Sequence, residues 1–204
     1  MLTSTYTLVA LSVEQTAVRA ALHSLAEAVH ALPETPAVVP AHAAGLCARL
    51  REAYDHCHWR KLDKFLIPVL RRCGAPFDAL LHKLDGLSEE AARALRAAAA
   101  CLESGERGGH VDPHAFRHAA LSCVSALRHR LDREEHDLFP LARGAVGGEA
   151  WFAIANQMLA HDAHAKERRG EQVSGPLRRE APGLDLYPVP VETGHRWTGL
   201  SILH

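Results

Sequence analysis

The sequence predicts an all-α protein: an antiparallel four-helix bundle with a short fifth helix and an irregular C-terminal tail. Four long stretches repeat apolar residues at intervals of three and four, the period of a helix that buries one face. The connections between them are short and contain proline or glycine, so neighbouring helices pack up and down. After Gly170 the helical period is lost and Pro, Gly, Arg and Glu dominate. We therefore expect a bundle over residues 1–169 and a tail over residues 170–204.

The first helix is predicted by one apolar stripe that ends at two prolines. Pro33 and Pro36 bring this helix to an end because proline lacks a backbone N–H and cannot continue a helix. Gln15 is the only polar member of the stripe, so its side chain is expected in the core. The stripe consists of Leu8, Leu11, Gln15, Val18, Leu22, Leu25, Val29 and Leu32.

The second helix is predicted from about Ala41 to Arg72, where the sequence CGAP (residues 73–76) breaks it. His58 belongs to the face that faces the core and is therefore expected to point inward. That face consists of Cys47, Leu50, Tyr54, His58, Leu62, Phe65 and Val69.

The third segment is less regular. Residues 76–85 predict a helix that Gly86 interrupts. Ser88, followed by two glutamates, fits the N-cap of an alanine-rich helix that runs to about Glu103. Gly86 therefore marks either a kink or a true break, and the sequence leaves both open.

The fourth helix is predicted to start with Asp112 as its N-cap and Pro113 at its first position. Its core stripe contains one acidic residue, Glu134, and Arg130 lies one turn earlier on nearly the same face. Both side chains are therefore expected to point inward. The stripe consists of Phe116, Ala120, Cys123, Leu127, Leu131, Glu134, Leu138 and Leu141.

A shorter fifth helix is expected from about Glu149 to Arg168, with an apolar face that docks on the bundle. Its docking residues are Trp151, Ile154, Met158 and Leu159. The tail keeps several large apolar residues, so it is expected to dock on the bundle or on a protein partner; they are Tyr187, Trp197, Leu200 and Ile202. Because every apolar stripe is complete before Gly170, residues 1 to about 168 are expected to fold alone.

Composition excludes several classes of partner. A net charge of -1 over 204 residues gives no electrostatic reason to expect nucleic acid or an anionic membrane. The N-terminus has no basic region ahead of its apolar run, and no stretch reaches the ~18 apolar residues of a membrane span. The five cysteines form no CxxC pair and are expected to be reduced and mostly buried. These features predict a cytoplasmic protein.

Two stretches of the chain echo each other. HWRKLDKFLIPVL (residues 58–70) and RLDREEHDLFPLA (residues 130–142) each have an apolar pair directly before a proline. This pattern resembles the hemerythrin-like (HHE cation-binding) family, whose second and fourth helices carry a His-x-x-x-Glu pair ahead of a Leu-Phe-Pro ending. The resemblance implies a four-helix bundle around a di-iron site.

The ligand positions of the family are only partly kept. Its histidine stands ten residues before the proline and its glutamate six, and the first repeat has His58 and Leu62 at these places. The second repeat has Arg130 and Glu134. In the first helix, Gln15 stands where the family usually presents a histidine after an acidic residue. The resemblance thus implies a degenerate site in which His58 and Glu134 are the surviving ligands, with Asp63 and Glu135 as possible substitutes.

Three functions remain open at this point. In the favoured hypothesis, the guanidinium of Arg130 replaces the missing cation, neutralises Glu134 and donates to Gln15, which predicts a metal-free polar cluster in a non-catalytic regulatory or interaction module. In the alternative, the centre holds iron, di-iron or mononuclear, and the resemblance implies binding or sensing of O2, NO or iron; any enzymatic role would be redox chemistry there. A third hypothesis, a thiol redox sensor, rests on Cys57 beside His58.

Overall fold

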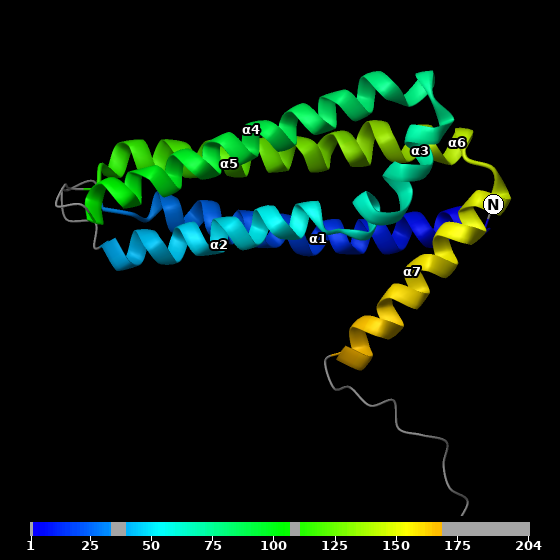
Figure 1. The fold of residues 1–204 in the computed structure, drawn as a ribbon, viewed down its shortest axis with the longest axis horizontal. Helices are drawn as coiled ribbons and strands as arrows, with labels where there is room; N and C mark the ends of the chain where they lie inside the picture. Colours follow the sequence, from blue (N-terminus) through cyan, green and yellow to red (C-terminus); the bar gives the residue numbers. More distant parts are fainter. Residues whose placement is uncertain (1, 34–39, 107–110, 169–204) are drawn as a thin grey trace, which may run out of the picture.

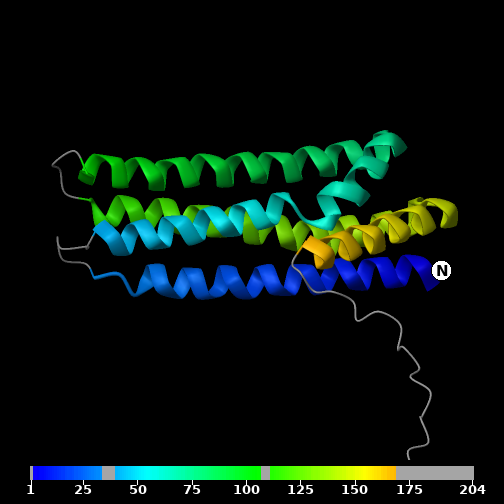
Figure 2. The ribbon, with the colours of Figure 1, turned by 60° about the horizontal axis from the view of Figure 1, so that its bottom comes forward.

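Four long helices run side by side as an antiparallel bundle in the computed structural model, which describes residues 2–33, 40–106 and 111–168 (Figures 1 and 2). They are α1 (Leu2–His30), α2 (Pro40–His58), α4 (Ala75–Glu106) and α5 (Pro113–Arg133). Every regular element of the described ranges is helical, which confirms the all-α class. Among the described residues, no helix is long and apolar enough to cross a membrane.

Helix α1 follows its predicted stripe without a shift. All eight positions from Leu8 to Leu32 are buried, including Gln15, which is 3% exposed. This agreement is expected because α1 is regular over its whole length, so one helical period holds from end to end.

The prediction of one continuous second helix to Arg72 was wrong. Helix α2 ends at His58, residues 59 and 60 form a bend, and the chain resumes as a π-helix, η1 (Leu62–Leu66), followed by α3 (Ile67–Cys73). Polar contacts stabilise the bend: Arg60 Nε donates to the Cys57 carbonyl over 3.0 Å, and the Lys61 backbone N–H donates to Glu14 over 3.1 Å. The predicted break at residues 73–76 is present, with Gly74 at a φ of 75° that favours glycine.

Helix α4 is continuous, so Gly86 does not break it, and Ser88 is not an N-cap. Ser88 lies inside the helix, where its Oγ donates to the Leu84 carbonyl over 3.0 Å. A glycine inside a helix costs only about 1 kcal/mol relative to alanine, and the long packing of α4 on α5 outweighs that cost.

The start of α5 was predicted correctly, because the Asp112 side chain accepts from the backbone N–H groups of His114 and Ala115. Beyond Arg133 the chain widens into a second π-helix, η2 (Glu134–Leu138), and continues as α6 (Phe139–Ala145). A π-turn inserts one extra residue and rotates the face that follows it. Leu141 is therefore exposed, contrary to prediction, and Ala142 is buried in its place.

The two π-helices occupy equivalent places in the two repeats. Each begins six residues before its proline, and that proline lies in the first turn of the helix that follows. The same one-residue shift affects the first repeat, where Leu66 and Leu70 are buried while Phe65 and Val69 are only half-buried. Each echoed stretch thus contains a π-helix, which is a local widening of the helix, directly before its proline-containing helix.

The predicted fifth helix is α7 (Gly148–Arg168), which lies against α1 and η1 (Figure 2). Trp151, Ile154 and Met158 are buried as predicted, whereas Leu159 is exposed. Leu159 follows Met158 directly and so lies about 100° around the helix from it. The expectations for the tail fall outside the described residues.

The buried apolar side chains form two separate clusters along the bundle. One surrounds Leu22, Leu50 and Leu127, and the other surrounds Leu66 and Leu138. Between them α1, α4, α5, the bend after α2 and the two π-helices contribute polar residues to the interior, so a polar layer divides the core in two.

Candidate functional site

The polar layer consists of six residues that come from six different segments of the chain. We call it the central cluster: Gln15 (α1), Arg60 (the bend after α2), Asp63 (η1), Ser88 (α4), Arg130 (α5) and Glu134 (η2). Five of the six are buried, and the Asp63 side chain is 19% exposed. Because ionised groups lose their hydration when buried, each needs a charged or polar partner inside the protein.

Glu134 is the centre of the cluster. It is completely buried, and both carboxylate oxygens accept hydrogen bonds. Oε1 accepts from Arg60 Nη2 over 2.6 Å and from Arg130 Nε over 3.0 Å, while Oε2 accepts from Gln15 Nε2 over 2.8 Å. Two guanidinium groups and one amide therefore hold a single carboxylate. Burial alone would lower the pKa of Arg60, but the charge of Glu134 and its hydrogen bond raise that pKa above its ordinary value.

Arg130 links Glu134 to the second carboxylate and to α4. Its Nη2 donates to Asp63 Oδ1, and its Nη1 donates to Ser88 Oγ over 2.7 Å. The other Asp63 oxygen lies 3.8 Å from Arg60 Nη2. Burial raises the pKa of Asp63 above its ordinary value, and the charges of Arg130 and Arg60 oppose that rise. With both carboxylates ionised, two positive and two negative groups balance in the layer.

His58 lies beside the central cluster and is half-buried. Its ring stacks on Tyr54 with a centroid separation of 4.5 Å, and its Nε2 is 3.2 Å from the Tyr54 hydroxyl. Its Nδ1 is buried and has no hydrogen-bond partner among the described residues. Burial, and next the charge of Arg130, lower the pKa of His58, so the neutral imidazole is favoured.

The remaining predicted site residue, Glu135, is not part of the cluster. It is exposed and accepts from Arg19 Nη2 over 3.0 Å, while Arg19 Nη1 donates to Asp132 over 2.6 Å. Glu135 follows Glu134 directly, and one residue turns the side chain about 100° around a helix. That turn places it on the surface.

Sequence reasoning missed two members of the cluster, Arg60 and Ser88, and misassigned one hydrogen bond. Gln15 donates to Glu134, whereas a donation from Arg130 to Gln15 had been expected. Arg60 carried no usable signal, because it lies in the bend after α2 and not on a continuing helical face. Ser88 was taken for an N-cap, so its position inside α4 was not considered.

The central cluster does not fit the di-iron site that the family resemblance implies. Gln15, Leu62 and Arg130 stand at three positions where the resemblance implies ligands, and Leu62 belongs to the apolar core. The carboxylate of Glu134 is engaged by two permanent cations, which would repel a metal ion placed beside it. Within the ranges 2–33, 40–106 and 111–168, no group of three or more His, Cys, Asp or Glu side chains could hold a metal ion.

The buried cysteines near the cluster are poor candidates for a redox site. Burial raises the pKa of Cys57 to about 11 and that of Cys123 to about 12, so little reactive thiolate forms near neutral pH. Three of the five cysteines are buried, as expected, and Cys73, the last residue of α3, is exposed.

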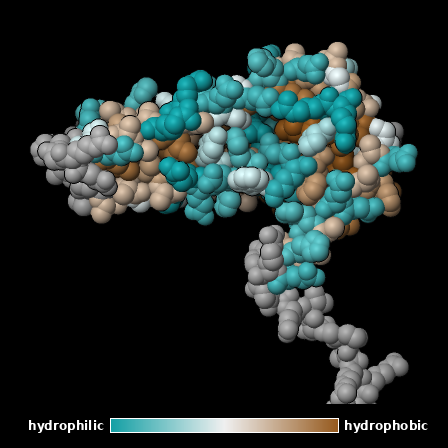
Figure 3. All heavy atoms as spheres, viewed as in Figure 1, coloured by the Kyte–Doolittle hydropathy of each residue, from teal (hydrophilic) through white to brown (hydrophobic). Residues whose placement is uncertain are grey.

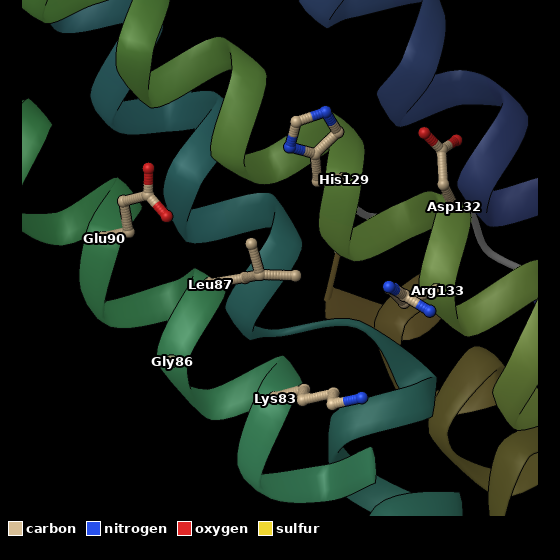
Figure 4. A pocket seen from close by; sticks show the side chains of 7 residues that line it. All are labelled: Lys83, Gly86, Leu87, Glu90, His129, Asp132 and Arg133. Atoms are coloured by element: carbon tan, nitrogen blue, oxygen red, sulfur yellow. The ribbon is translucent and has the colours of Figure 1, made fainter.

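A surface hollow of about 500 Å³ lies between α4 and α5 (Figure 4). Its charged residues are already paired or mixed in sign: Asp132 accepts from Arg19, Arg133 donates to Asp137, and Lys83 lies on the α4 wall together with Glu90. The hollow exists partly because Gly86 has no side chain, and a Cβ added there would meet no atom within 4 Å. We assign it no chemistry.

The central cluster falls inside the range that a comparison with known families identifies. Residues 8–142 match the family model described as the Hemerythrin HHE cation binding domain. That range begins in α1, ends in α6 and contains all six residues of the cluster. Comparisons with curated proteins and with solved structures give no match.

Proposed function

The chain belongs to the hemerythrin HHE cation-binding domain family, and we propose that it is a member whose central metal site is replaced by the charge-balanced central cluster. In this proposal the protein holds no cofactor and acts as a non-catalytic regulatory or interaction module. The family as a whole supports cation and iron binding, so the proposal concerns how this chain departs from it.

The observation that carries the proposal is the double clamp on Glu134. Arg60 and Arg130 both donate to the same carboxylate oxygen, at 2.6 Å and 3.0 Å. A guanidinium is always charged, so these two groups supply the positive charge that a metal would otherwise bring to a buried glutamate. Gln15 completes the set because its side-chain amide donates to the other oxygen of Glu134. A metal-binding histidine at this position would instead offer a nitrogen lone pair to the metal.

The cluster connects the two halves of the bundle core. Its bonds run from α1 to η2, from the α2 bend to η2, and from α5 to η1 and α4. Because a buried ionic network is satisfied in only one arrangement of the helices, it favours a unique packing of the bundle. A fixed bundle of this kind suits recognition through its surface.

One observation favours the second candidate function, an iron-binding member that senses O2, NO or iron. His58 Nδ1 and Asp63 Oδ2 are both buried and have no hydrogen-bond partner among the described residues. They are the donor types that iron accepts, and the two residues are five apart in the sequence. Two donors are fewer than a stable iron site needs, so this candidate ranks second.

The test is reconstitution with iron(II) followed by air, observed by absorption. Iron(III) held by carboxylates and histidines absorbs in the near-ultraviolet and visible regions, so a filled site is coloured. We expect no colour in the wild-type protein after unbound iron is removed. The triple variant Gln15→His, Leu62→Glu and Arg130→His restores the family pattern and is expected to take up more iron.

The control is Arg133→His, which adds a histidine on the exposed face of the same helix. Colour in the control equal to that of the triple variant would trace iron uptake to surface histidines. Colour in the wild type that disappears with His58→Ala would instead support the iron-binding candidate and overturn the proposal.

A further inference from the structure

One end of the molecule presents an apolar face to solvent. On α1, Leu2, Tyr6, Val9 and Val13 follow the spacing of one helical stripe, and their exposed fractions range from 56% to 90%. On α7, Phe152 and Leu159 are 61% and 51% exposed. We call these six residues the apolar face. Figure 3 shows one side of the molecule, where hydrophobic residues lie around the end that carries α3 and α6 and also toward the opposite end, and hydrophilic residues cover much of the middle.

A groove of about 350 Å³ runs between the two helices within this face. Leu2 and Tyr6 line it from α1, and Phe152 and Leu159 line it from α7. No charged side chain lines the groove. A contiguous exposed apolar surface of this kind marks an interaction site more often than it marks ordinary surface.

We propose that the C-terminal segment 184–203 of this same chain binds in this groove and covers the apolar face. The segment holds most of the large apolar residues that follow α7, with Asp185, Glu192 and Arg196 as its charged residues. The apolar ones are Leu184, Leu186, Tyr187, Val189, Val191, Trp197, Leu200, Ile202 and Leu203. The residues between Arg168 and Leu184 are richer in Pro, Gly, Arg and Glu and suit a linker.

The length of the chain after α7 allows this contact. Arg168 lies 16 residues beyond Phe152 on one helix, which corresponds to about 24 Å at about 1.5 Å per residue. An extended chain advances about 3.3 Å per residue, so a linker of roughly ten residues already covers that distance. Residues 169–183 are therefore sufficient to return the segment to the groove.

The chemistry of the segment matches that of the groove. The run LYPVPV (residues 186–191) is uncharged and contains Pro188 and Pro190, which have no backbone N–H to leave unsatisfied in an apolar site. Proline-rich segments bind grooves lined by aromatic rings because they lose little conformational entropy on binding. Tyr6 and Phe152 supply two such rings, one from each helix.

A bound segment would control access to the apolar face. Any partner that recognises Leu2, Tyr6 and Phe152 would first have to displace it, so the affinity of that partner would be reduced by the fraction of molecules in which the face is covered. This inference does not depend on whether the central cluster binds metal.

Limited trypsin digestion of the full chain tests the proposal. The bond after Arg196 lies inside the proposed bound segment, whereas the bonds after Arg178 and Arg179 lie in the linker. We expect cleavage after Arg196 to be at least about tenfold slower in the folded protein than in a synthetic peptide of residues 190–204, because cleavage requires the segment to leave the groove. Cleavage after Arg178 should proceed at the rate of its own peptide.

The variant Tyr6→Ser with Phe152→Ser removes both rings from the groove and should return cleavage after Arg196 to the peptide rate. Its helix content should stay at the wild-type value because neither side chain belongs to the core clusters of the bundle. The matched control is Trp59→Ser, an equally exposed aromatic in the groove between α1 and α2, which should leave the protection in place.

Two results would overturn the proposal. The first is cleavage after Arg196 at the peptide rate in the wild type, or protection that the double variant does not change. The second is a concentration-dependent dimer in sedimentation that the double variant dissociates, because the apolar face would then be covered by a second copy of the chain.

Discussion

The guanidinium of Arg60 and the carboxylate of Glu134 meet at 2.6 Å in the bundle centre, although 74 residues separate them in the sequence. Each comes from one of the two echoed stretches, and both are almost completely buried. The contact exists because α2 ends early and the bend turns Arg60 inward. A completely buried acid is thereby held by a permanent organic cation.

The first prediction concerns the two arginines. Arg130→Ala leaves Glu134 and Asp63 with a weaker set of partners in a buried site, so we expect it to lower the free energy of unfolding by about 3 to 5 kcal/mol. Arg60→Ala should cost a similar amount. Urea denaturation at neutral pH measures both. The matched control is Arg133→Ala, which breaks an exposed pair with Asp137 at the same four-residue spacing and should cost less than about 1 kcal/mol.

A double-mutant cycle separates the ion pair from the loss of packing. Removing Arg130 and Glu134 together should cost less than the sum of the two single changes, because the second deletion removes the unpaired charge that the first one leaves. Equal losses for Arg130→Ala and Arg133→Ala, or strict additivity in the cycle, would contradict the assignment of a buried network.

The second prediction concerns two glycines with opposite expectations. Gly86 lies within the continuous helix α4 with open space around it, so Gly86→Ala should stabilise the protein by roughly 0.5 to 1 kcal/mol. Gly74 has a φ of 75° and ends α3, so Gly74→Ala should destabilise it by about 1 to 2 kcal/mol. Thermal melting measures both. If Gly86→Ala destabilised the protein, the continuous α4 would be wrong.

The third prediction concerns pH. The folded state lowers the pKa of His58 below its value of 6.5 in the unfolded chain, so on acidification the unfolded chain takes up the proton first. Stability from this group is fully present above pH 6.5 and is lost as pH falls through 6.5 towards the folded pKa. The groups that set this shift besides burial are Arg130, Asp63, Arg60 and Asp55.

We therefore expect the free energy of unfolding to fall more steeply in the wild type than in His58→Phe between about pH 7.5 and about pH 5.5. Phenylalanine keeps a ring against Tyr54, and the raised pKa of Asp63, which acts in the opposite direction, is common to both proteins. Urea titrations at several pH values give the comparison. Parallel curves would show that the folded state does not lower the pKa of His58.

Much of the fold could be predicted from the sequence because regular helices have a regular period. The stripe of α1 was correct at every position, and Asp112 and Pro113 marked the start of α5. The stripe of α5 also predicted inward positions for Arg130 and Glu134, and the structure buries both.

The errors fall where the helical period changes. The two π-helices each insert a residue, and no propensity of Leu62–Leu66 or Glu134–Leu138 predicts that widening, so Leu141 and Phe65 were misplaced by the same shift. Arg60 was missed because its inward turn depends on a helix end that tertiary contacts create. Long-range pairing of this kind is not encoded in local spacing.

Metal analysis of untagged protein distinguishes a metal-free central cluster from an iron site. Iron and zinc per chain are measured in protein purified without an affinity tag, because exposed histidines such as His114 and His118 can retain metal from a column. We expect well under one iron per chain and no change in melting temperature when a chelator is added. About one iron or more per chain, lost in His58→Ala, would contradict this expectation and return this chain to the metal-binding members of its family.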